Sequence, residues 1–129
     1  MIDMQLLQYL KSLLANQAGE EETGSYNLPN DTAENTAIEI TNTKRVRLDA
    51  VWLDFNTLVQ DCTIKVYHKI DGTNYREYDS YSWATTEEDG VLLSNIVVNN
   101  DWKITITSTV AQGSVVAIPY NVIKTTMEA

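Results

Sequence analysis

Two alternating runs of apolar and polar residues, joined at Asp71-Gly72, constrain the fold of this chain more than any other feature. The runs cover residues 63–70 and 74–83, and each has the period of two that an extended strand requires. Asp-Gly between such runs supplies the positive φ angles that a tight hairpin turn needs. The segment therefore predicts a β-hairpin.

The same period of two recurs along most of the chain after residue 26. Ile38 and Ile40 alternate with polar residues, and the apolar parity changes after Ala50, which predicts a β-bulge or a crossing between sheets. Turn signals recur at the spacing of an antiparallel sandwich, and no helical segment alternates with the strands, as a parallel sheet would require. We therefore expect an all-β fold, an antiparallel β-sandwich resembling a jelly roll, with about seven or eight strands.

The N-terminal residues follow a helical period instead. Within residues 2–16, apolar side chains recur at steps of three and four, as in an amphipathic helix. A helix this short is marginal alone, so its apolar face must pack on its own domain, a sister subunit or another protein. Glycines and acidic residues predict a linker next. The expected organisation is a helical arm over 1–18, a linker over 19–25 and a β-sandwich over 26–129.

Charge and hydropathy exclude two classes of partner. The chain has 129 residues, with 9 Lys and Arg against 18 Asp and Glu, for a formal net charge of −9. An acidic surface repels the phosphate backbone that dominates nucleic-acid affinity. No stretch approaches the roughly 18 apolar residues of a membrane span, and the N-terminus lacks the basic residues of a signal peptide. We expect neither a nucleic-acid nor a membrane partner.

The chain offers no set of residues for catalysis, metal binding or cofactor binding. His68 is the only histidine, so neither a catalytic triad nor a multi-histidine metal site can be assembled. Cys62 is the only cysteine and is expected to be a semi-buried thiol. The acidic segment 87–90 lacks EF-hand spacing, and phosphate-loop and GxSxG motifs are missing. The sequence predicts a non-enzymatic protein without metal or cofactor.

The hairpin carries the most prominent aromatic pattern. A three-residue turn at 71–73 would place Lys65 opposite Asp79 and Tyr67 opposite Glu77. One face would then gather aromatic and charged side chains, which is compatible with cross-strand packing, a protein interface or a platform for stacking sugars. The candidate interface residues are the hairpin aromatics Tyr67, Tyr75, Tyr81 and Trp83, together with Leu6, Leu10, Leu13 and Leu14 of the arm.

Four segments resemble small β-sandwich proteins encoded among the structural genes of tailed phages, a group that includes head decoration proteins. They are Val51-Trp-Leu-Asp-Phe55, the hairpin over 66–83, Trp102-Lys-Ile-Thr-Ile106 and Ile118-Pro-Tyr-Asn121. The resemblance implies a capsid decoration, or cement, protein that binds the major capsid protein or another virion protein. It further implies a homo-oligomer, with a trimer favoured, on the outer surface of the capsid after synthesis in the host cytoplasm. The alternative is a carbohydrate- or receptor-binding module of a phage tail fibre or baseplate.

Overall fold

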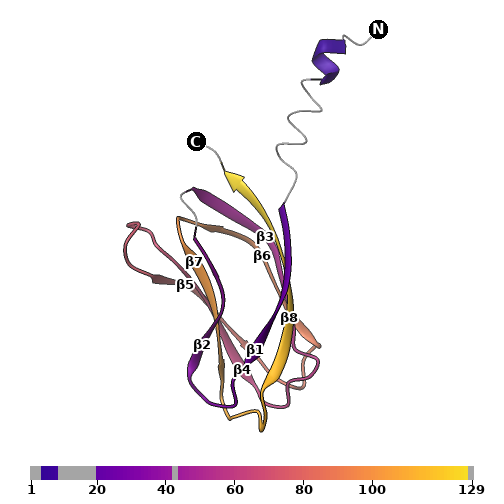
Figure 1. The fold of residues 1–129 in the computed structure, drawn as a ribbon, viewed down its shortest axis with the longest axis vertical. Helices are drawn as coiled ribbons and strands as arrows, with labels where there is room; N and C mark the ends of the chain where they lie inside the picture. Colours follow the sequence, from indigo (N-terminus) through magenta and orange to yellow (C-terminus); the bar gives the residue numbers. More distant parts are fainter. Residues whose placement is uncertain (1–3, 9–19, 42–43, 128–129) are drawn as a thin grey trace.

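The structure, a computed structural model, describes residues 4–8, 20–41 and 44–127, and its strands form two antiparallel four-stranded sheets (Figure 1). One sheet has the order β1-β8-β3-β6 and the other the order β2-β7-β4-β5. We call these two sheets and their loops the β body. The strands are β1 (Glu20–Leu28), β2 (Glu34–Ile40), β3 (Arg45–Asp54), β4 (Cys62–His68), β5 (Arg76–Trp83), β6 (Gly90–Val98), β7 (Trp102–Ser108) and β8 (Val116–Met127).

One hydrophobic core lies between the sheets and receives side chains from both. In β4, burial alternates residue by residue, so Ile64 and Val66 face the core while Lys65 and Tyr67 face outward. This alternation is expected for a strand with one face in solvent and the other packed on the core. The expected all-β, antiparallel organisation is confirmed, with eight strands.

The parity change expected after Ala50 is present in β3. The pairing of β3 with β8 shifts between Leu48 and Ala50, which marks a bulge and not a crossing between sheets. Beyond the bulge, Val51 and Leu53 face the core, and Trp52 between them is exposed. The bulge therefore determines which β3 side chains reach the outer surface.

The turn of the β4–β5 hairpin is longer than predicted. Regular pairing stops at the strand ends, so residues 69–75 form a loop rather than a tight turn. Within it Gly72 has φ 77°, and the Asp71 carboxylate accepts hydrogen bonds from the backbone N–H groups of Thr73 and Asn74, both at 2.8 Å. These bonds hold the pKa of Asp71 down at about 2. The Asp-Gly signal located the turn, and the carboxylate fixes its shape.

A second bulge, which was not predicted, lies within the hairpin itself. Tyr67 pairs with Glu77 as expected, but the register then shifts around Tyr78, so that Lys65 lies opposite Ser80 and not opposite Asp79. A slip of one residue turns every following side chain to the other face of the sheet. The predicted register is therefore wrong for the second half of β5.

The N-terminal residues differ from the predicted arm and linker. Residues 4–8 are helical, within the helix expected over 2–16, whereas Leu10, Leu13 and Leu14 lie outside the described residues. The side chains of Met4 and Leu6 remain 64% and 53% exposed. Two apolar side chains of the described part of the arm, those of Met4 and Leu6, are therefore left largely in water.

The linker prediction over 19–25 is wrong for residues 20–25, which belong to β1. This strand pairs with β8 from Glu20 opposite Lys124 onward. A Cβ at Gly24 would come within 2.4 Å of the Tyr120 hydroxyl, so this glycine makes room for an aromatic ring on the neighbouring strand. Charged side chains are tolerated here because β1 is an edge strand. The β body therefore begins at residue 20 and not at residue 26.

His68 lies on the inner side of β4 in a buried position. Its Nδ1 accepts a hydrogen bond from the backbone N–H of Asn99 at 3.2 Å, and its ring meets the Tyr78 ring edge-on, with centroids 5.0 Å apart. Burial lowers the pKa of His68, because the charged imidazolium loses hydration inside the protein.

We expect the free energy of unfolding to fall as the pH is lowered from about 7 through the ordinary histidine pKa of about 6.5. In that range the unfolded chain takes up a proton that folded His68 resists, so acid favours unfolding. His68→Gln keeps an acceptor for Asn99 and does not titrate, so its stability should stay level over the same range. Urea unfolding of both proteins between about pH 7 and about pH 5.5 makes the measurement, and parallel pH profiles would contradict the assignment.

Candidate interaction surface

The bulge around Tyr78 divides the four hairpin aromatics between two faces. Tyr67 points outward, but Trp83 lies opposite Cys62 on the inner side and is only 5% exposed. Tyr81 lies opposite Ile64 and packs against the core. The prediction that these aromatics share one outer face is therefore wrong for Trp83 and Tyr81.

Tyr67 and Tyr75 remain on the outer side, where they enclose the ammonium group of Lys103. The Nζ atom of Lys103 lies 5.1 Å from the Tyr67 ring centroid and 4.5 Å from that of Tyr75. Lys69 approaches the Tyr75 ring to 4.7 Å and forms an ion pair with Asp101 at 2.9 Å. We call this outer surface of the β2-β7-β4-β5 sheet the tyrosine face.

Carboxylates complete the pairing of charges on the tyrosine face. Glu34 accepts hydrogen bonds from the Tyr67 hydroxyl and, at 2.7 Å, from the Thr105 hydroxyl, and these bonds lower the pKa of Glu34. Loss of hydration together with the Glu34 bond raises the pKa of Tyr67 to about 12. Lys65 pairs with Glu77 at 3.0 Å. The polar groups of this face thus satisfy one another, which leaves them less available to a partner.

Trp83 acts inside the molecule, as an anchor for the loop over 84–89. Its indole N–H donates to the Glu88 carbonyl at 2.8 Å, and its ring packs edge-on against Phe55, with centroids 5.0 Å apart. The backbone N–H of Phe55 donates to the Asp89 carbonyl at 2.7 Å. The loop is therefore fixed to the core by the tryptophan that the sequence had suggested as a surface residue.

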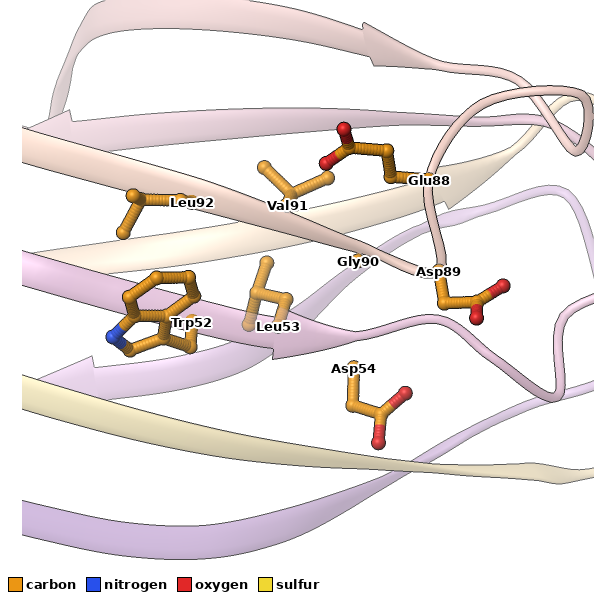
Figure 2. Close-up of a pocket in the computed structure, with 8 residues that line it drawn as sticks. All are labelled: Trp52, Leu53, Asp54, Glu88, Asp89, Gly90, Val91 and Leu92. Carbon is orange, nitrogen blue, oxygen red and sulfur yellow. The ribbon is translucent and has the colours of Figure 1, made fainter.

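A hollow of about 320 Å³ lies between this loop and the outer side of β3 and β6. Trp52 and Leu92 form one end of it and are 50% and 47% exposed. Figure 2 shows the indole of Trp52 on β3, with Leu92 on the adjacent β6. We call this the Trp52 hollow, and its lining residues are Trp52, Leu53, Asp54, Glu88, Asp89, Gly90, Val91 and Leu92.

Gly90 lines the Trp52 hollow and lies opposite Asp54 in the β3–β6 ladder. Gly90 has no side chain to fill the surface there, and a Cβ would come within 2.5 Å of the Leu53 carbonyl oxygen. A larger residue at position 90 would thus displace the backbone of β3. The close approach of these two strands therefore favours glycine at position 90.

Three acidic side chains line the hollow: Asp54 and Asp89 at the end away from Trp52, and Glu88 beside Val91. All three are exposed. Within residues 4–8, 20–41 and 44–127, none of them forms an ion pair with a lysine or arginine. The contrast with the tyrosine face is clear, because there the charges are already paired.

Other kinds of site find less support. Over the described ranges, no group of three or more His, Cys, Asp and Glu residues is arranged to hold a metal ion. Cys62 is buried, and burial together with the nearby Asp61 raises the pKa of its thiol to about 12, which suppresses the reactive thiolate. No helix in the described part of the chain is long and apolar enough to cross a bilayer.

Comparison with known proteins shows similarity at the level of fold. No protein-family model matches the chain, and no curated protein matches it. A protein of Bacillus endospore appendages, which form disulfide-linked pili, aligns with a TM-score of 0.58 at 14% identity over 85% of this chain and 88% of that chain. This likeness shows a shared fold.

Two further solved structures align less closely. A mitogen derived from Yersinia pseudotuberculosis aligns with a TM-score of 0.48 at 11% identity, over 86% of this chain and 89% of that chain. VP2 of the infectious bursal disease virus subviral particle aligns with a TM-score of 0.45 at 9% identity, over 84% of this chain and 31% of VP2.

Proposed function

We propose that this chain is a non-enzymatic structural protein of a virus particle, and more narrowly a capsid decoration protein of a tailed phage. On this proposal it lies on the outer surface of the capsid, where it binds the major capsid protein and neighbouring copies of itself, with a trimer favoured. The helical arm makes the anchoring contacts, and the β body is displayed.

We further propose that the β body is a jelly-roll sandwich. The strand orders β1-β8-β3-β6 and β2-β7-β4-β5 support this, because each sheet alternates strands from the two halves of the chain, as two interlocked Greek keys do. The endospore appendage protein shares the fold and belongs to a pilus, so the fold is compatible with a role in an assembly. The buried thiol of Cys62 gives no support to disulfide links of the kind named for those pili.

The observation that carries the proposal is the exposure of Met4 and Leu6 on the short helix. A helix of so few residues is unstable in water without tertiary contacts. Removing exposed apolar side chains from water lowers the free energy of the system by about 25 cal/mol for each Å² buried. A partner that covers this arm would therefore both order it and hold the protein in place.

Deleting residues 1–18 should abolish binding to particles assembled without the chain, while the β body stays folded. The β body is expected to survive because β1 begins at Glu20 and pairs with β8. Co-sedimentation with particles measures binding, and far-UV circular dichroism measures folding.

A matched pair of point variants separates apolar anchoring from charge. Leu6→Asp and Gln8→Asp each add one negative charge to the described helix, but only the first removes an apolar side chain. Leu6→Asp should weaken co-sedimentation and Gln8→Asp should leave it unchanged. Wild-type binding by the deletion variant would refute the anchoring role.

The alternative, a carbohydrate- or receptor-binding module of a tail fibre or baseplate, is favoured by one observation, the half-exposed indole of Trp52. Trp83 cannot serve as a stacking platform because it is buried. A glycan array with the wild-type chain and with Trp52→Ala discriminates between the two functions. Saturable binding that Trp52→Ala removes supports the alternative.

A further inference from the structure

The Trp52 hollow combines two surfaces of different chemistry along its length. Trp52 and Leu92 give one end an apolar surface, and Asp54 and Asp89 give the other end formal negative charge. In Figure 2 the indole and the Leu92 side chain lie together at one end, the carboxylates of Asp54 and Asp89 lie at the other, and that of Glu88 lies beside Val91. An occupant must therefore be apolar along part of its length and cationic at its tip.

Among protein side chains, lysine and arginine have this character, because each carries a charged group on an apolar stem. Arginine fits better, since its planar guanidinium stacks on aromatic rings and can bond a carboxylate through two parallel N–H groups. We propose that the Trp52 hollow binds an arginine side chain presented by a partner protein of the particle. This inference rests on the proposed structural function, and it assigns a chemistry to the partner surface.

The charge around the hollow favours a cation over a neutral sugar. The three carboxylates are free of lysine and arginine partners in the described ranges, and the chain as a whole carries −9. A concave surface lined by one sign of charge concentrates its field and attracts the opposite sign. A neutral sugar can donate hydroxyl hydrogen bonds to these carboxylates, but it has no net charge for that field to attract.

The hollow is also held in shape before anything binds. Its loop wall is fixed by the bonds from Trp83 to the Glu88 carbonyl and from Phe55 to the Asp89 carbonyl. Its floor is fixed by the close approach of Gly90 to Leu53. A site that is already ordered loses little conformational entropy on binding, so even a single side chain can be held there.

The test uses the full-length chain and two small probes, Nα-acetyl-arginine methylamide and the corresponding citrulline compound. Citrulline has nearly the shape of arginine but no charge. Nuclear magnetic resonance follows the indole N–H signals of the three tryptophans during titration. We expect the arginine probe to shift the Trp52 signal saturably, with affinity falling as salt rises, and the citrulline probe to leave it unchanged.

Two double variants undergo the same change in net charge, one at the hollow and one away from it. Asp54→Asn with Asp89→Asn and Glu20→Gln with Glu22→Gln each remove two negative charges, which changes the net charge from −9 to −7. The first double variant should lower the affinity for the arginine probe by about tenfold or more, and the second should lower it by less than about twofold. The Trp83 indole signal reports the loop over 84–89, and should be unchanged in both variants.

Other outcomes overturn the inference. Equal binding of the citrulline probe would show that shape rather than charge is recognised. Saturable binding of methyl glucoside or N-acetylglucosamine at Trp52, with the arginine probe silent, would show a sugar site. If no probe shifted the Trp52 signal, the hollow would not be a binding site for an arginine side chain. In each case the arm deletion still tests the structural role separately, because it uses particles and different residues.

Discussion

Trp83→Ala should destabilise the protein by about 3–5 kcal/mol, a large share of the roughly 5–15 kcal/mol that holds an ordinary domain folded. The indole is only 5% exposed and packs edge-on against Phe55, so its removal leaves a cavity in the core. The Glu88 carbonyl also loses its donor, which frees the loop that forms one wall of the Trp52 hollow. Chemical denaturation in urea measures the loss of stability.

The exposed tryptophan provides the control for this prediction. Trp52→Ala removes the same side chain from a position that is 50% exposed, and should change the free energy of unfolding by only about 0.5 kcal/mol. If the two alanine variants proved equally stable, the assignment of Trp83 to the core and of Trp52 to the surface would be wrong. Trp83→Phe should fall between them, because it keeps an aromatic ring but loses the bond to Glu88, worth about 1 kcal/mol.

Trp102→Ala should cost about 3–5 kcal/mol as well, since the side chain is fully buried in β7 at the centre of its sheet. Trp102→Phe should cost much less than Trp102→Ala. The Trp102 indole Nε1 is buried without a hydrogen-bond partner in the described part of the chain. Removing a buried donor without a partner recovers about 1–3 kcal/mol, which offsets part of the lost packing.

The two phenylalanine variants therefore make a sharp comparison. The same substitution breaks a hydrogen bond at position 83 and removes an unpaired donor at position 102. Relative to the wild type, Trp102→Phe should therefore cost less stability than Trp83→Phe. Urea unfolding of the wild type and the two phenylalanine variants makes the measurement, and a larger loss at position 102 than at position 83 would contradict the assigned hydrogen bonding.

Local patterns predicted much of the fold because each reflects a property of a single strand. The parity change after Ala50 could be found in the sequence, since the apolar side chains on either side of it are unmistakable. The bulge around Tyr78 could not, because residues 76–83 are polar or aromatic throughout and both faces of that strand look alike. One unseen bulge was enough to place Trp83 on the wrong side of the sheet.

The remaining errors concern relations between strands, which a single strand does not encode. The acidic segment of residues 20–22 has the composition of a linker, but an edge strand needs a partner on one side alone, and β8 provides it. The outward position of Trp52 follows from the parity of Val51 and Leu53. The hollow beside it does not, because its lining comes from two paired strands and from the loop over 84–89.

The pairing of β1 with β8 also has a mechanical consequence. Glu20 lies opposite Lys124, so the start of β1 and the end of β8 emerge at the same end of the molecule (Figure 1). A pulling force between these two points would open the ladder one hydrogen bond at a time, as a zipper opens. A force between Glu20 and the start of β8, which lies at the opposite end of the ladder, would instead load the β1–β8 hydrogen bonds together in shear. A tether through the arm thus resists load best when that load is applied at the opposite end of the β body.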